Sequence, residues 1–252
     1  LGTARLIDGY NRAMPIGERI SPRRALLGVL IALFHDSGYV RRNGDRAGNG
    51  AAYTLSHVQR SGELLERILT SLGFAADAPL AGKIVHFTGY EMPLDAIDVH
   101  DPRDRALGFM IASSDLMVQT ADRCYLEKCR DFLSPEFEVA GLAGPPQPGG
   151  PKPLYANVDV LMRGTPEFNA KLWEDRLDGY FGGIHRYFGV HFEGRYGAPD
   201  PYTDAIKANL RRMKLAIRSG RFDALRLRPR ADDASCMRNA LGLPTEELAA
   251  AA

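Results

Sequence analysis

The sequence predicts an all-α protein, and three observations carry that prediction. Capping residues precede a proline at the first position of a helix four times, at Ser21-Pro22, Asp101-Pro102, Thr165-Pro166 and Asp200-Pro201. Apolar residues follow at spacings of three and four, as on the buried face of a helix. Sustained strand-type alternation is absent from the sequence. We therefore expect helices throughout.

Each predicted element follows from its own pattern. The segment after Ser21 is expected to be helical through His35, and apolar spacing between Leu55 and Leu72 marks a second helix. A third helix is expected to end near His86. After Asp101, apolar residues continue to Leu133 and predict a single helix of roughly thirty residues.

One break in composition divides the chain. Residues 141–157 contain five prolines and several glycines, so they cannot form a helix and are expected to be an exposed connection. We place a boundary there, between a helical core at residues 1–140 and a helical extension at residues 158–252. The extension is either a separate lobe or a completion of the same core.

Composition excludes several classes of protein. The chain has 252 residues with a formal net charge of +1, which gives no global attraction to nucleic acid or to an anionic membrane. Its longest apolar run, Ala25–Phe34, has ten residues, whereas a membrane span needs about 20. Three cysteines without a CxxC motif exclude a disulfide framework and a cysteine zinc finger. A reducing, cytoplasmic setting is the default expectation.

The C-terminal part is locally basic. Four cations share one face of a predicted helix: Lys207, Arg211, Lys214 and Arg218. A solvated face of a packed amphipathic helix is favoured over a surface for an acidic partner or nucleic acid.

Polar residues of metal-binding types interrupt otherwise apolar helices. His35 and Asp36 end the most apolar helix, where an unpaired polar pair at the mouth of the core would be costly. A divalent metal ion would offset that cost. His57, His86 and Asp115 follow on successive predicted helices, each beside an apolar neighbour. We predict these five residues as metal ligands. The remaining histidines are expected to be structural or exposed: His100, His185 and His191.

The order of these residues resembles the HD-domain superfamily of metal-dependent phosphohydrolases. The phrases ALFHDSGY, ASSDL and DLMVQTADRCYLEK carry the resemblance, which covers Leu1 to Phe137. It implies an all-α core in which His35, Asp36, an upstream histidine and Asp115 bind a first metal. His57 and His86 resemble the two-metal subset of the family, in which the aspartate of the HD pair bridges both ions.

The chain departs from the family pattern at its start. Residues 1–14 contain no histidine. We therefore expect that the upstream ligand either lies before Leu1 or is lost, and its loss would weaken the first metal position. The lysine often found after the HD pair is also missing.

Imidazole and carboxylate ligands without thiolate suit one or two ions of Mn, Fe, Zn, Co or Mg. Asp36 is predicted to be catalytic, as the bridging ligand that orients a metal-bound hydroxide. Lys83 lies one turn before His86 and is predicted to supply a catalytic cation to the phosphate.

Substrate contacts are expected from two places. Arg41, Arg42 and Arg46 lie in a glycine-rich loop that is either a substrate lid or a plain surface connection. On the long helix, Gln119 and Asp122 are expected to share the face of Asp115, with Arg123 beside them, and to contact substrate or support the ligands. For Asp122, an ion pair with Arg123 or Arg105 is the favoured alternative.

These features predict a metal-dependent phosphohydrolase or phosphodiesterase that acts on a small phosphorylated compound. A homo-oligomer is left open, and neither a membrane nor a nucleic acid is expected as a partner. Two alternatives remain. One is a di-iron oxygenase of the same superfamily, and the other is a degenerate HD domain that binds or senses a ligand.

Overall fold

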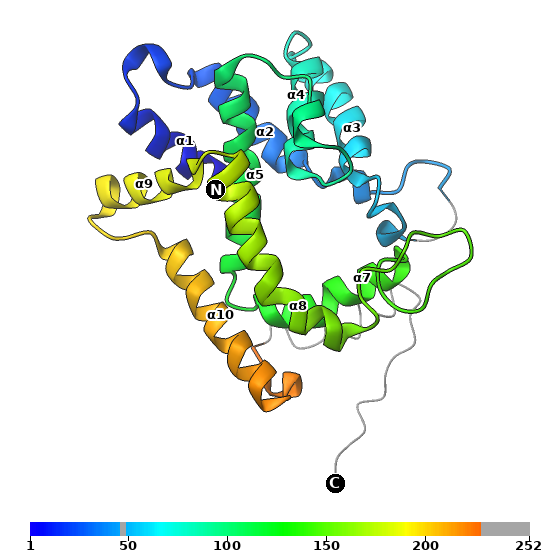
Figure 1. Cartoon of the computed structure of the whole chain (residues 1–252). Coiled ribbons are helices and arrows are strands. Elements are labelled where there is room, and N and C mark those ends of the chain that lie inside the picture. The colour runs from blue at the N-terminus through cyan, green and yellow to red at the C-terminus, as the bar shows by residue number, and fades with distance from the viewer. Residues whose placement is uncertain (46–48, 228–252) are drawn as a thin grey trace. The chain divides into compact units, whose positions relative to one another are not determined.

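A computed structural model describes residues 1–45 and 49–227, and these residues confirm the all-α prediction (Figure 1). The only β pairing among them is an isolated bridge between Ala143 and Tyr155. The α-helices are α1 (Gly2–Ala13), α2 (Pro22–Phe34), α3 (His57–Ser71), α4 (Ala78–Ile84), α5 (Pro102–Ala121), α6 (Tyr125–Lys128), α7 (Ser134–Val139), α8 (Val158–Lys171), α9 (Tyr187–Tyr196) and α10 (Pro201–Ser219).

Three of the four predicted helix starts are confirmed. The side chains of Ser21 and Asp101 accept hydrogen bonds from the first turns of α2 and α5, and Asp200 does the same for α10. The predicted start at Thr165 is wrong, because α8 begins at Val158 and contains Pro166 inside it. Asn157 caps this helix by accepting from the Val160 amide at 3.0 Å, so the helix is already formed when the chain reaches Thr165.

The predicted thirty-residue helix after Asp101 is also wrong in length. Helix α5 ends at Ala121, and Asp122 leaves helical geometry with a ψ of 132°. The chain then forms α6, the π-helical segment η6 (Cys129–Leu133) and α7. Apolar spacing continues across the break because both sides bury an apolar face, so periodicity alone cannot reveal the turn at Asp122.

The described chain forms two compact units that interleave along the sequence. Unit 1 comprises residues 1–40, 55–122 and 167–208, and unit 2 is formed by residues 41–54, 123–166 and those from 209 onward. Each unit therefore takes residues from both sides of the 141–157 connection. That connection is irregular and mostly exposed, as predicted, and its ends are joined by a 2.8 Å hydrogen bond from the Leu154 amide to the Leu142 carbonyl.

Unit 1 is built around α5, which packs against α1, α2 and α4, while α1 also packs closely on α9 (Figure 1). Gly9 makes the α1–α9 approach possible, since a Cβ there would lie 1.9 Å from the carbonyl oxygen of Tyr187. Next to it, Nδ1 of His191 lies 2.7 Å from Oδ2 of Asp8. Residues from the first and the last segment of unit 1 thus share one core.

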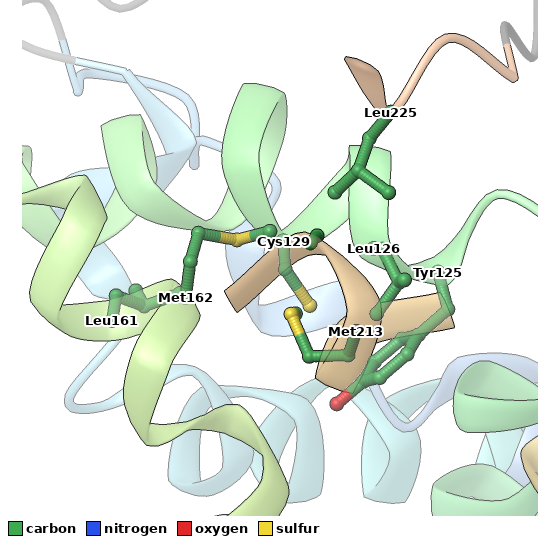
Figure 2. Close-up of a cluster of buried hydrophobic side chains, with 8 residues drawn as sticks. Tyr125, Leu126, Cys129, Leu161, Met162, Met213 and Leu225 are labelled. Carbon is green, nitrogen blue, oxygen red and sulfur yellow. The ribbon is translucent and has the colours of Figure 1, made fainter. Parts of the chain in front are cut away.

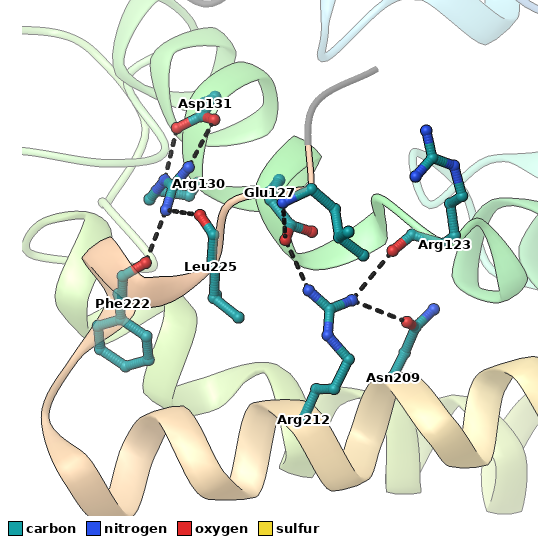
Figure 3. Close-up of polar contacts among 9 residues, drawn as sticks. Arg123, Glu127, Arg130, Asp131, Asn209, Arg212, Phe222 and Leu225 are labelled. Atoms are coloured by element: carbon teal, nitrogen blue, oxygen red, sulfur yellow. Dashed lines mark hydrogen bonds and ion pairs between the residues drawn. The ribbon is translucent and has the colours of Figure 1, made fainter. Parts of the chain in front are cut away.

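Unit 2 has its own apolar cluster (Figure 2). Its buried members come from α6, η6, α8, α10 and the segment after α10: Tyr125, Leu126, Cys129, Leu161, Met162, Met213, Ala216 and Leu225. Polar contacts surround this cluster (Figure 3). Nη2 of Arg212 donates to Oε1 of the buried Glu127 at 2.6 Å. Nη1 of Arg130 donates to the carbonyl oxygens of Phe222 and Leu225.

The predicted basic face of α10 is solvated. Lys207, Arg211, Lys214 and Arg218 are all exposed, whereas Ile206 and Met213 on the opposite face are buried. The basic residues Arg228, Arg230 and Arg238 lie outside the described residues, as does Cys236. Cys124 and Cys129 are buried thiols. No helix in the described part of the chain combines the length and apolarity of a membrane span.

The buried His185 makes the stability of unit 1 sensitive to pH. Burial lowers the pKa of His185, and the charge of Asp178 only partly offsets it. Below about pH 6.5 the unfolded chain therefore binds a proton that the folded chain excludes. The free energy of unfolding consequently decreases as the pH is lowered. His185→Phe keeps a ring beside Trp173, which lies 5.1 Å away between centroids. We expect this variant to lose less unfolding free energy than the wild type between pH 7.5 and 5.5 in urea titrations; equal losses would contradict this role.

Candidate metal centre

His35 lies at the C-terminal end of α2, with one ring nitrogen committed to the backbone. Its Nδ1 lies 2.9 Å from the carbonyl oxygen of Ala32, which fixes the N–H on Nδ1 and leaves the lone pair on Nε2 when the ring is neutral. Nε2 is buried and makes no hydrogen bond to the described residues. Oδ1 of Asp115 lies 3.3 Å from it and Oδ2 of Asp36 lies 3.4 Å away. This orientation is the one that a metal-binding histidine needs.

The carboxylates dominate the electrostatics around His35. Burial alone lowers the pKa of the imidazole, but the contact with Asp115 and the charges of Asp115 and Asp36 outweigh it and raise the pKa to about 9. The surroundings of Nε2 therefore favour a positive charge at this position, whether a proton or a metal ion supplies it.

Asp36 faces two histidines with different oxygens. Its Oδ2 is the atom near His35, while its Oδ1 lies 3.6 Å from Nε2 of His57. Ligand atoms bonded to one ion at about 2.0 to 2.1 Å lie about 2.8 to 3.0 Å from each other at octahedral angles and about 3.3 to 3.4 Å at tetrahedral angles. The pairwise distances in this cluster are close to those values, and the two oxygens of Asp36 point toward two ligand positions.

A close backbone approach positions His57 beside the His-Asp pair. His57 is the first residue of α3, and its ring stacks on Tyr39 with a centroid distance of 4.3 Å. The turn after Asp36 packs against this point: the Gly38 amide donates to Oγ of Ser61 at 2.8 Å, and Nε of Arg60 donates to the Gly38 carbonyl at 2.8 Å. A Cβ at Gly38 would lie 1.8 Å from the His57 carbonyl oxygen. Only glycine fits this approach.

Asp115 enters the cluster from α5. Its neighbours Ser114 and Leu116 are buried, and Oγ of Ser114 lies 2.7 Å from Oγ1 of Thr3 on α1. These contacts fix the rotation of α5, so that the half-buried Asp115 faces His35.

His86 lies in the 3₁₀ segment η4 (Val85–Thr88) and has a carboxylate partner that the sequence analysis missed. Its Nδ1 lies 2.6 Å from Oε1 of Glu91. Burial raises the pKa of Glu91, but the contact with His86 and the charges of His86 and His57 lower it by more. The pKa of Glu91 is therefore below its usual value. Glu91 thus interacts electrostatically with both histidines. A separation of five residues across an irregular bend gives no periodic signal, so nothing in the sequence marks this pair.

The predicted substrate and catalytic residues are only partly brought to this cluster. Lys83 forms an exposed ion pair with Asp98, with Nζ 2.5 Å from Oδ2. Gln119 is exposed on α5, one turn after Asp115. The prediction that Asp122 shares this helical face is wrong, because α5 ends before it.

The other predicted cations lie in unit 2. Arg41, Arg42 and Arg123 are exposed there, and Arg46 lies outside the described residues. The carbonyl oxygen of Arg123 accepts a hydrogen bond from Arg212 (Figure 3). Their substrate roles stay predictions.

Within residues 1–45 and 49–227, no three His, Cys, Asp or Glu side chains are arranged as a complete metal site. The cluster instead runs from pair to pair, through His57, Asp36, His35 and Asp115. The donor types and the buried lone pair of His35 nevertheless fit a divalent ion with nitrogen and oxygen ligands. No protein-family model, curated protein or solved structure matches the chain.

Gly38→Ala tests the approach that joins the two parts of the site. The new methyl group would collide with backbone, which cannot rotate away, so we expect the free energy of unfolding to fall by about 3 kcal/mol. Gly17→Ala is the matched control, because a Cβ there meets nothing within 4 Å, and we expect a change within about 0.5 kcal/mol. Similar stabilities for the two variants in urea titrations would show that the approach is not a constraint.

Proposed function

We propose that the protein is a metal-dependent phosphohydrolase or phosphodiesterase of small phosphorylated compounds. Its ligand residues are His35, Asp36, His57, His86 and Asp115, which hold one or two divalent ions. The observation that carries the proposal is the buried Nε2 of His35, which makes no hydrogen bond to the described residues and faces two carboxylates at 3.3 and 3.4 Å. Such an arrangement is costly unless a cation completes it.

A bound divalent ion would lower the pKa of a coordinated water and neutralise charge on the phosphoryl oxygens. The residues of the chain supply orientation. Asp36 has a side chain that is 59% exposed, so it reaches solvent while its two oxygens face His35 and His57. It is therefore placed to accept a hydrogen bond from the attacking water and orient it.

Other groups support this role. The ion pair between Lys83 and Asp98 is exposed and therefore weak, so a phosphate can compete for Lys83 at little cost. A reducing, cytoplasmic setting forms part of this proposal, and the buried thiols of Cys124 and Cys129 are compatible with it.

Metal content and hydrolysis test the proposed ligands directly. The native protein is expected to contain stoichiometric metal and to hydrolyse p-nitrophenyl phosphate or its diester. His35→Ala and Asp36→Asn should each lower both by at least about 100-fold, since loss of an outer partner alone costs 10- to 100-fold. His100→Ala is the control, because that histidine is 88% exposed and pairs with Asp98. Retention of metal in the first two variants would exclude this site.

Glu91→Gln tests the partner of His86. The carboxylate holds the imidazole in one orientation and increases its basicity as a ligand, whereas the amide keeps the shape without the charge. We expect metal affinity to fall by about 10- to 100-fold, measured by titration of chelator-treated protein. An unchanged affinity would remove His86 from the ligand set.

A further inference from the structure

Arg176 lies beside the candidate metal centre, although it comes from a much later part of the chain. It belongs to the π-helical segment η7 (Leu172–Tyr180), within unit 1. Its Nη2 donates to the carbonyl oxygen of Gly89 at 2.8 Å, and its guanidinium carbon lies 3.5 Å from the ring centroid of Tyr90. These two contacts anchor the guanidinium on the segment that follows η4.

One nitrogen of this guanidinium is not used by the fold. Nη1 of Arg176 is shielded from solvent and finds no acceptor among the described residues. Among the residues that the structure describes, no carboxylate lies within ion-pair distance of Arg176. Burial lowers the pKa of Arg176, and the nearby Tyr90 and Glu91 only partly offset this effect. A desolvated cation with unused N–H groups is costly unless an anion completes it.

The segment that anchors Arg176 also connects this arginine to the candidate metal centre. Glu91 follows Gly89 and Tyr90 directly in the chain, and its Oε1 lies 2.6 Å from Nδ1 of the candidate ligand His86. Burial raises the pKa of Tyr90, with a further increase from the charge of Asp115, against the opposing charge of Arg176. Tyr90 is 61% exposed as a residue, so this segment reaches solvent. Arg176 therefore lies against an exposed segment that is continuous with Glu91, the partner of His86.

We propose that Arg176 is the oxyanion-binding residue of this site and that Nη1 donates to a non-bridging oxygen of the substrate's phosphate group. Nη2 and the Tyr90 ring hold the guanidinium in place while Nη1 remains available. Arginine stays charged at all physiological pH values and forms strong hydrogen bonds to phosphate oxygens. This inference deepens the proposed function and rests on it for the identity of the ligand.

Inorganic phosphate is the probe that tests the role of Arg176 without turnover. Phosphate is titrated calorimetrically into the full-length wild type and into Arg176→Gln, which removes the charge. We expect the affinity to fall by about 10- to 100-fold, the value of one hydrogen bond to a charged group. Arg176→Lys should also weaken binding, because a single Nζ cannot serve both the Gly89 carbonyl and the phosphate.

Arg105→Gln is the matched control. Arg105 is also half-buried and lies over an aromatic ring, Phe109, at 5.4 Å, but its donors are used by the Tyr180 hydroxyl and the Val99 carbonyl. We expect this variant to bind phosphate like the wild type. An equal loss in both variants would mean that the effect is structural, and it would overturn the inference.

Parallel assays separate this inference from the proposed function. If the wild type contains metal and hydrolyses phosphoesters while Arg176→Gln binds phosphate equally well, the inference fails and the function stands. If the wild type has neither metal nor hydrolysis but its phosphate affinity depends on Arg176, the function fails and the anion site stands. Should Arg176→Gln not fold, an unchanged affinity in Arg176→Lys overturns the proposal.

Discussion

The close approach between the turn after α2 and the start of α3 is the constraint on which the candidate site depends. The turn follows His35 and Asp36 directly, and the backbone it touches belongs to His57. Because the contact is made by backbone, and Ser61 holds the turn by a hydrogen bond, the distance between the two segments leaves little freedom. Asp36 therefore lies between two histidines by virtue of chain geometry rather than side-chain flexibility.

The candidate site contains one region that favours a cation and another that favours an anion. The carboxylates of Asp36 and Asp115 surround the Nε2 atom of His35 and favour a cation there. Across the segment that contains Tyr90, the guanidinium of Arg176 favours an anion. The ligand that we propose, a phosphorylated compound with a divalent ion, would satisfy both regions at once, whereas an uncharged ligand would leave both costs in place.

The sequence predicts the all-α class and three of four proline-marked helix starts correctly, since both depend on local spacing and on capping residues. The ligand roles of the histidines and aspartates stay predictions. The predicted helix start at Thr165 is wrong because a threonine before a proline has the same local pattern at a helix start and inside a helix. The predicted helix across Asp122 is too long because apolar spacing continues on both sides of the break that ends α5. Glu91 and Arg176 were missed for a different reason. Their roles arise from contacts across the tertiary structure, which no local pattern encodes.

The pairing of α1 with α9 determines when the site can be completed. Asp8 and His191 are 183 residues apart in the chain, and Gly9 packs against the carbonyl of Tyr187. Contacts at such separations require closure of a long loop, which slows folding relative to a bundle of sequence neighbours. During synthesis, the first helix is made long before the helix that covers it. All five candidate ligands, of which Asp115 is the last in the chain, are therefore made before α9 (Tyr187–Tyr196), whose packing on α1 completes unit 1.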